Sequence, residues 1–449
     1  MTAVHSPASR LADALERLGA RDVHLGIFDI DGLFRHKLVD AAKAVKLAGG
    51  GYRFCDVIYG WDTGEQTYSN DDSYIDRPCF IDPEATRKFP FSGSGAVCIA
   101  DFEGEFGLKS PRNQLLRLLD EAAGMGFEVH SAFEFEFFLL QETPDTLRAK
   151  AFRDIEHFAK ANRTYSLQSA ALYEEMLGDF RDTMSVLGIE MDSIHSELGP
   201  GCFEAPLAVE TGVRSADNAA LFKNFAKVFF LRRGLTVAFM SKLSPKLPGQ
   251  SGHFHLSLRS RDDGHPVFSD STDADGLSKT ARHFIGGLLR LLPESLALCS
   301  HTVNAYKRMV PGLWAPTAAN WGIQNRTAAI RVINDAPAST RIEFRVPSAD
   351  TNPHAAMALC LGAGLWGIRN AVEPPPPSFG SQYDATVAAN LRFPRNLYEA
   401  ADRLDRSRIS REIFGNDFID HFVMSRIAEA SAHQRDVSEW ELRRYLEVV

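Results

Sequence analysis

The sequence lacks the features of several protein classes. Six cysteines are spread over 449 residues without a Cys-x-x-Cys pair, so neither a disulfide framework nor a zinc knuckle is expected, and a reducing, cytoplasmic compartment fits. Acidic residues (58) outnumber basic ones (49), and the net charge of −9 argues against nucleic acid as a partner. The Gly-x-x-x-x-Gly-Lys-Ser/Thr phosphate loop, the Gly-x-Gly-x-x-Gly turn and internal repeats are all missing.

Signals for membrane insertion are missing as well. Residues 1–10 contain no apolar stretch of the signal-peptide type. Residues 351–368 carry no formally charged side chain, but they contain His354 and three glycines and open with Asn352-Pro353. This pattern predicts a buried helix with an asparagine N-cap and a proline in its first turn, so no membrane is expected as a partner.

The composition and the length of the sequence indicate a globular protein of two domains. Hydrophobic residues make up 45% and charged residues 24%, and the length is about three times that of a usual single domain. A helix is expected to start at Ser110-Pro111, so we place the boundary just before it. The prediction is an α+β fold, with an N-terminal domain over 1–107 and a larger catalytic domain over 108–449.

The start of the chain predicts a helix followed by a β-hairpin. Residues 11–18 are amphipathic, and the strand-like segments 23–29 and 34–39 flank the turn Asp31-Gly32. Residues 59–82 are rich in Asp, Gly, Ser and Thr and predict a long loop of functional type. The four-proline run at 374–377 predicts a stiff, extended surface connection, with partner binding as the less favoured alternative.

Candidate chemistry begins in a strand with alternating side chains. In residues 132–140, Glu134 and Glu136 share one face, and phenylalanines occupy the other. Taken alone, this pattern fits an ordinary half-solvated strand at least as well as a site.

Three further segments carry polar residues in comparable patterns. His253, His255 and Ser257 share one face of the strand 252–258. Arg341, Glu343 and Arg345 share the polar face of the strand 341–346, and Glu197 and Glu204 flank the turn Gly199-Pro200-Gly201. None of these segments is specific alone.

Together the segments supply five carboxylates and a histidine, which would repel one another without cations. Oxygen-rich ligation favours Mg²⁺ or Mn²⁺ over zinc or copper. Arginines follow closely in the sequence, and metal ions with clustered arginines are typical of phosphoryl transfer. They are Arg308, Arg326, Arg331, Arg341 and Arg345.

The chain resembles the glutamine synthetase family over nearly its whole length, with matching order and spacing. The resemblance implies a β-grasp-like N-terminal domain, a larger catalytic α/β domain, and a homo-oligomer, a dodecamer of two stacked rings. Each active site would be shared between the catalytic domain of one subunit and the N-terminal domain of its neighbour. The matching segments are Phe133-Glu-Phe-Glu136, Glu197–Glu204, Gly249–Ser257, Asn304–Gly312, Asn325–Arg331 and Arg341–Arg345.

The resemblance also implies a role for each matching residue. One metal ion would bind Glu136, Glu197 and Glu204, and a second would bind Glu134, His253 and Glu343. The other implied positions are Arg326, Arg331 and Arg345 around the transferred phosphate and the substrate carboxylate, Arg308 and Gly249 at glutamate, and His255, Ser257, Arg331 and Arg341 at the nucleotide.

The implied reaction uses ATP as co-substrate. The γ-carboxylate of L-glutamate attacks the terminal phosphate, and an amine then displaces phosphate to give a γ-glutamyl amide. Members of the family that use ammonia bind and deprotonate ammonium with an Asp from the N-terminal loop and a Glu from the flap that follows a Val-Pro-Gly element. Asp56 and Asp62 are the two candidates for that aspartate.

The flap is where this sequence departs from the family. Leu313 and Trp314 follow Val310-Pro311-Gly312, so the flap carboxylate is replaced by an apolar side chain. Tryptophan contacts alkyl or aryl groups and cations but cannot accept a proton. We therefore expect both residues to contact an organic amine, a small or aromatic monoamine before a polyamine. Glutamine synthesis with ammonia is the alternative, and a non-catalytic assembly a less favoured one because all six metal positions are filled.

Overall fold

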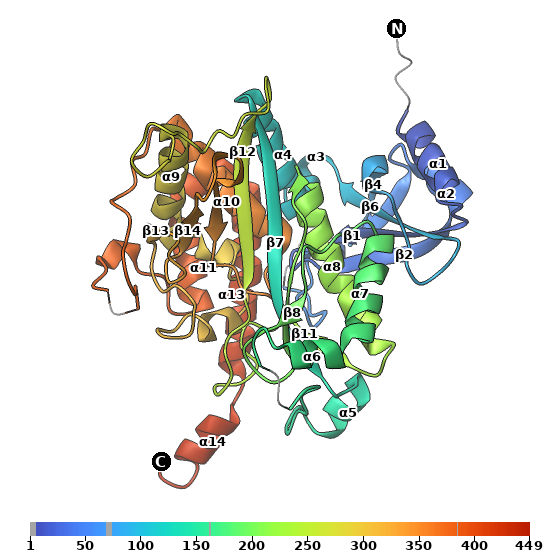
Figure 1. Cartoon of the computed structure of the whole chain (residues 1–449). Helices are drawn as coiled ribbons and strands as arrows, with labels where there is room; N and C mark the ends of the chain where they lie inside the picture. Colours follow the sequence, from blue (N-terminus) through green and yellow to red (C-terminus); the bar gives the residue numbers. More distant parts are fainter. Residues whose placement is uncertain (1–5, 69–73, 161–162, 384) are drawn as a thin grey trace.

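Two β-sheets organise the chain: in Figure 1 the first lies on the right of the molecule, and the second runs through its centre. The computed structural model describes residues 6–68, 74–160, 163–383 and 385–449. The first sheet has six strands and carries the N-terminal helices, and the second has nine strands and carries most of the other helices. Sheets and helices in separate layers confirm the predicted α+β class.

The first sheet has the strand order β2-β1-β6-β4-β3, with β5 paired to β6. The predicted hairpin is confirmed, because β1 and β2 pair antiparallel with Phe28 opposite Phe34. Asp29 closes the turn by accepting the backbone N–H groups of Asp31 (3.0 Å) and Leu33 (2.9 Å). The strands are β1 Asp22–Phe28, β2 Phe34–Asp40, β3 Tyr52–Cys55, β4 Asp76–Ile81, β5 Arg87–Lys88 and β6 Gly95–Phe102.

The prediction of a loop throughout residues 59–82 was wrong at its C-terminal end. There β4 pairs antiparallel with both β3 and β6. Its paired residues lie 19 to 27 positions away in sequence, so the local composition gave no sign of them. Residues 69–73 of the expected loop lie outside the described residues.

The second sheet has the order β13-β14-β15-β12-β7-β9-β8, with β10 and β11 also paired to β7. Its central strands are the predicted ones, and phenylalanines on one face of β7 pack into the main core. The strands are β7 Phe127–Leu140, β8 His195–Ser196, β9 Cys202–Pro206, β10 Glu210–Thr211, β11 Thr236–Ala238, β12 Gly252–Ser260, β13 Trp321–Ile323, β14 Ile330–Ile333 and β15 Arg341–Phe344.

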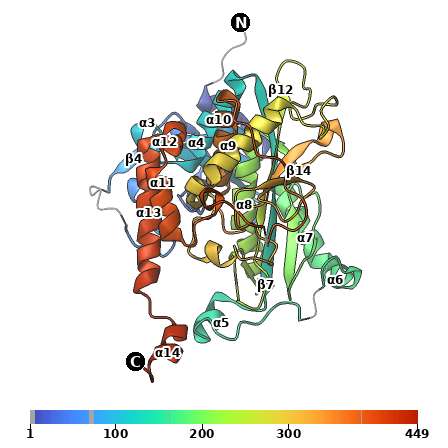
Figure 2. The same ribbon diagram turned by 90° about the vertical axis from the view of Figure 1, so that its left-hand side faces the viewer.

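Helices cover the apolar sides of both sheets. Turned by 90°, the molecule shows α9 and α10 side by side, α11 beside α13, and α14 leading away from the rest (Figure 2). The helices are α1 Pro7–Arg17, α2 Ala41–Leu47, α3 Gly104–Gly107, α4 Pro111–Gly124, α5 Pro144–Ala149, α6 Leu167–Leu172, α7 Glu174–Val186, α8 Arg214–Leu231, α9 Lys279–Ser295, α10 Pro353–Arg369, α11 Leu397–Arg406, α12 Arg408–Phe414, α13 Asn416–Arg435 and α14 Glu439–Tyr445.

Helix α10 is the buried helix predicted from its cap. Asn352 accepts the backbone N–H groups of His354 and Ala355, and Pro353 occupies the first turn. In the part of the chain that the structure describes, no helix combines the length and the apolarity needed to span a bilayer.

Buried polar contacts join the two sheets. Arg426 of α13 lies 2.7 Å from Asp31, and Arg112 of α4 bridges Asp82 (2.7 Å) and Asp217 (2.8 Å). These pairs hold the N-terminal sheet against the helices of the larger unit. The boundary between residues 107 and 108 stays a prediction.

Candidate active site

Strand registers bring the predicted polar residues to one region of the second sheet. His253 lies opposite Glu134 across β12 and β7, and Glu136 lies opposite Glu204 across β7 and β9. Glu343 lies opposite His255 on one side and Arg331 on the other. Neighbouring strands therefore assemble the polar residues from segments as much as 209 positions apart.

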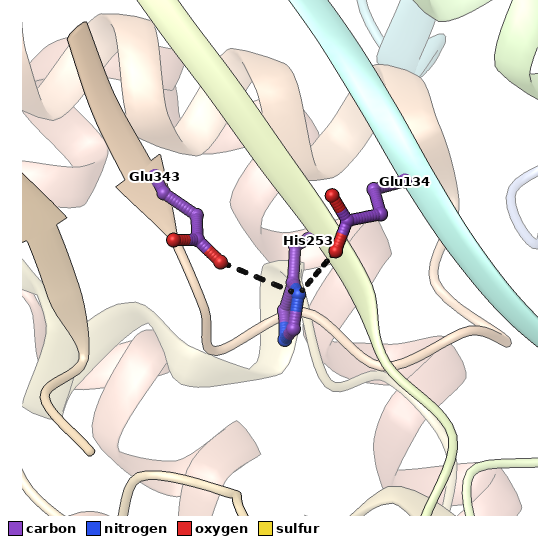
Figure 3. Close-up of side chains that lie close together, drawn as sticks. All are labelled: Glu134, His253 and Glu343. Atoms are coloured by element: carbon purple, nitrogen blue, oxygen red, sulfur yellow. Dashed lines mark hydrogen bonds and ion pairs between the residues drawn. The ribbon is translucent and has the colours of Figure 1, made fainter. Parts of the chain in front are cut away.

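The first cluster consists of Glu134, His253 and Glu343 (Figure 3). The Nδ1 atom of His253 lies 3.2 Å from Glu134 Oε1 and 3.5 Å from Glu343 Oε1. Two arginines, Arg331 (2.9 Å) and Arg345, also contact Glu343. Burial alone would raise the pKa of Glu343, but Arg345 and His253 lower it to about 2.

The second cluster consists of Glu136, Glu197 and Glu204, in which one oxygen of each carboxylate lies within 4.8 Å of the others. Burial, followed by repulsion from Glu134 and Glu136, raises the pKa of Glu204 to about 8. Burial also raises the pKa values of Glu136 and Glu197. In the protein alone, burial and mutual repulsion therefore oppose the simultaneous ionisation of these three carboxyl groups.

Both clusters fit a hard divalent cation. Each brings three donor groups together, and oxygen predominates over nitrogen without sulfur. Glu197 Oε2 and His253 Nε2 are buried without a hydrogen-bond partner among the described residues. A cation between the carboxylates would neutralise their repulsion.

Two cavities meet at Glu134, which lines both. The first, of about 480 Å³, is bounded by four of the clustered glutamates, by residues 248–251 and by the flap. The second, of about 410 Å³, contains His255, Ser257 and Arg341. Most residues predicted for substrate and most of those predicted for nucleotide thus line separate cavities, which are adjacent at Glu134 of the first cluster.

Most of the predicted substrate residues line the first cavity. Arg308 is buried there and donates to the backbone oxygens of Val346 (3.0 Å) and Arg345 (3.2 Å). A Cβ atom on Gly249 would lie 2.5 Å from Arg308 Cγ, so only glycine permits this approach. The other predicted residues in its lining are Arg326, Arg345, Leu313 and Trp314.

Four predicted residues, Glu343 of the first cluster among them, do not line either cavity in this chain. Arg331 is held by Glu343 and by Gln324 (2.9 Å). In the N-terminal sheet region, Asp56 is buried and accepts from Arg77 Nε at 2.9 Å, and Asp62 accepts the backbone N–H groups of a local turn. Neither aspartate reaches the cavity of its own chain.

Two further residues, not predicted from the sequence, lie beside the second cluster. Tyr165 lines the first cavity, and its ring centroid lies 4.8 Å from that of His195. His195 Nε2 lies 3.5 Å from Glu204. His195 stands two residues before Glu197 in an extended segment, so the same alternation argument would have placed it on this face. Tyr165 belongs to an irregular segment and gave no such signal.

Comparisons with known proteins identify the family. The family described as "Glutamine synthetase, catalytic domain" matches residues 108–445. The chain belongs to this family, which confirms the resemblance predicted from the sequence.

Individual relatives cover nearly the whole chain. A type-1 glutamine synthetase 2 of Dictyostelium discoideum is 34% identical over 94% of this chain and 82% of its own. A glutamate–isopropylamine ligase of a Pseudomonas species is 32% identical over 98% of both chains. The solved structure titled "Apo GmaS without ligand" superposes with a TM-score of 0.84 at 28% identity, covering 97% of this chain and 99% of that one. These alignments extend the match to the N-terminal sheet.

Proposed function

We propose that this protein is an ATP-dependent ligase that joins the γ-carboxylate of L-glutamate to an organic amine. In the first step, a γ-carboxylate oxygen attacks the terminal phosphorus of ATP, and ADP leaves. In the second step, the amine nitrogen attacks the resulting acyl phosphate, phosphate leaves, and one proton is lost from nitrogen. The product is a γ-glutamyl amide.

The observation that best supports this proposal is which carboxylates line the first cavity. Among the described residues that line it, the only carboxylates are Glu134, Glu136, Glu197 and Glu204, all of them in the two clusters. At the flap, Leu313 and Trp314 face the cavity instead of a carboxylate. No acidic side chain of this chain is left over to hold ammonium, whereas an apolar wall suits an alkyl or aryl group.

The two clusters would hold two divalent cations, Mg²⁺ or Mn²⁺, which polarise phosphoryl oxygens and neutralise their charge when bound. Arg326, Arg331 and Arg345 would stabilise the transferring phosphoryl group, and Arg308 with Gly249 would bind glutamate. The second cavity would receive the nucleotide against His255, Ser257 and Arg341. Glu134 lies where both spaces meet, which supports transfer at that point.

The amine must lose a proton during the second step, and Trp314 cannot accept it. We assign this role to Asp56 or Asp62 of a neighbouring copy, because neither lines the cavity of its own chain. This assignment requires a homo-oligomer, which we propose to be a dodecamer of two stacked rings. Sedimentation velocity tests the assembly, and a monomer with full activity would contradict a shared site.

A monoamine is favoured over a polyamine as the acceptor. The distal ammonium group of a polyamine needs a carboxylate, and the flap offers none. The relative named for isopropylamine supports a small alkylamine. Glutamine synthesis is the second candidate, since a relative of similar identity is named a glutamine synthetase.

The test is phosphate release from Mg-ATP and L-glutamate with ammonium, methylamine, isopropylamine, ethanolamine, aniline or putrescine, with products identified by mass spectrometry. We expect an organic monoamine to exceed ammonium in kcat/KM by at least tenfold. Preference for ammonium would make this protein a glutamine synthetase with an altered flap. Binding of nucleotide and metal without turnover of any amine would indicate a non-catalytic assembly.

A further inference from the structure

The proline run leads into a segment that contacts the active-site loops. We call Pro374–Tyr383 the strap. Residues 320–327, which comprise the short strand β13 and the turn that carries Arg326, we call the arginine loop. The sequence predicted a stiff surface connection at the prolines, and the described residues of this stretch form no helix or strand. Its backbone is instead attached to the arginine loop at several points.

The first attachment lies at the prolines. The indole Nε1 of Trp321 donates to the carbonyl oxygen of Pro375 at 2.7 Å, and the backbone N–H of Ser378 donates to Trp321 O at 2.7 Å. A Cβ atom on Gly322 would lie 2.6 Å from Ser378 O, so the two backbones are in direct contact. Trp321 is fully buried, which gives this attachment a rigid base.

The second attachment surrounds Arg326. Asn325 Nδ2 donates to the carbonyl oxygens of Ser378 (3.2 Å) and Gly380 (3.0 Å). Thr327 Oγ1 accepts the backbone N–H of Gln382 at 3.1 Å. The residues on both sides of Arg326 are therefore bonded to the strap, whereas the Arg326 side chain projects into the first cavity.

The end of the strap reaches the flap. The Tyr383 hydroxyl is buried without a hydrogen bond of regular geometry among the described residues. Its neighbours are nonetheless charged or polar. Burial raises the pKa of Tyr383, and Arg345, the Trp314 backbone and Arg308 oppose that rise. The buried Tyr383 hydroxyl thus lies beside the Trp314 backbone of the flap and feels the charge of two arginines that line the first cavity.

We infer that the strap positions both sides of the active site, with Thr327 and Asn325 fixing Arg326 and Tyr383 fixing Trp314. These are positioning residues, since they act through Arg326 and Trp314. The inference rests on the proposed function, because it gives those two side chains separate tasks at phosphate and at amine. It explains why the strap begins with a proline run, which loses little conformational entropy on ordering.

The test compares Thr327→Val with Thr327→Ser, and Tyr383→Ala with Tyr383→Phe, in the full-length protein. Thr327→Val keeps the shape but removes the hydroxyl, and it should lower kcat by about tenfold with the amine KM unchanged, since misplacement of about 1 Å costs up to a hundredfold. Thr327→Ser should restore kcat. Tyr383→Ala should raise the amine KM by about tenfold and leave the ATP KM unchanged. Comparison with Tyr383→Phe distinguishes the effect of the hydroxyl group from the effect of the ring.

Phe379→Ala is the matched control, because Phe379 is a strap residue with 82% of its surface exposed. Acrylamide quenching of Trp314, obtained by difference from Trp314→Phe, provides a readout that needs no turnover, and it should increase in Tyr383→Ala. If the wild type turns over no amine, the proposed function fails while the quenching still tests the strap. Unchanged quenching, no rescue by Thr327→Ser, or an equal loss in Phe379→Ala would overturn the inference.

Discussion

Replacement of Trp314 by alanine tests the acceptor site most directly. Trp314 lies on the wall of the first cavity with 54% of its surface exposed, and its backbone has a φ of 58°, a region that non-glycine residues rarely adopt. A tryptophan side chain in this conformation indicates that the flap is shaped to present it. We expect Trp314→Ala to lower kcat/KM for an alkylamine about tenfold and to affect ammonium much less.

The magnitude follows from the exposed area of the ring. A tryptophan of roughly 200 Å² that is half exposed offers about 100 Å², and a small alkyl group covers about half of that. At about 25 cal/mol per Å², this contact contributes about 1.25 kcal/mol, which corresponds to a factor of just under ten. Ammonium has no alkyl group, so it gains no binding free energy from contact with the Trp314 ring.

The assay is steady-state phosphate release with isopropylamine and ammonium as alternative acceptors. The KM values for ATP and glutamate serve as internal controls, and Trp314→Glu provides a second variant, which should shift preference towards ammonium by restoring a carboxylate at the flap. Equal losses for both acceptors in Trp314→Ala would refute the contact with the alkyl group and leave Trp314 a purely structural residue.

Three further predictions concern glutamate, metal and stability. Gly249→Ala should raise the glutamate KM more than tenfold, because its Cβ would collide with buried Arg308; Gly178→Ala, with open space around its Cβ, should be neutral. Mg²⁺ at about a hundred times its Kd should stabilise the EDTA-treated protein by about 2.7 kcal/mol in a thermal melt, and no shift would argue against cations at the two clusters. Asp217→Asn should cost about 3–5 kcal/mol in chemical denaturation, since it leaves buried Arg112 without its main partner. Arg112 holds the pKa of Asp217 below its usual value despite burial. The ionised Asp217 therefore stabilises the fold above about pH 4, and this stabilisation is lost as the pH falls further. The free energy of unfolding of Asp217→Asn should lack this dependence on pH.

Much of the cluster geometry followed from side-chain alternation alone. Glu134 and Glu136 had to share a face of β7, as did His253 and His255 on β12, because successive side chains in a strand point to opposite sides. The register that sets His253 opposite Glu134 depended on strand pairing over more than a hundred residues. Only the resemblance to a family supplied that pairing from the sequence.

Other parts of the site gave no local signal. Tyr165 belongs to an irregular segment, and it reaches the cavity because its backbone N–H donates to Ser196 O at 3.0 Å. The proline run predicted stiffness, but nothing in it indicated that the next residues bond to the arginine loop. Such contacts arise between segments more than thirty residues apart, and composition does not encode them.

The sequence by itself determined the residue types of the site, their faces on the strands and the loss of the flap carboxylate at Trp314, because these depend on chain order and on a period of two. The tertiary structure decided which strands are neighbours, where the two cavities meet at Glu134, and that Asp56 and Asp62 lie apart from the cavity of their own chain. These features depend on long-range pairing and packing, in which each contact is selected by the rest of the fold.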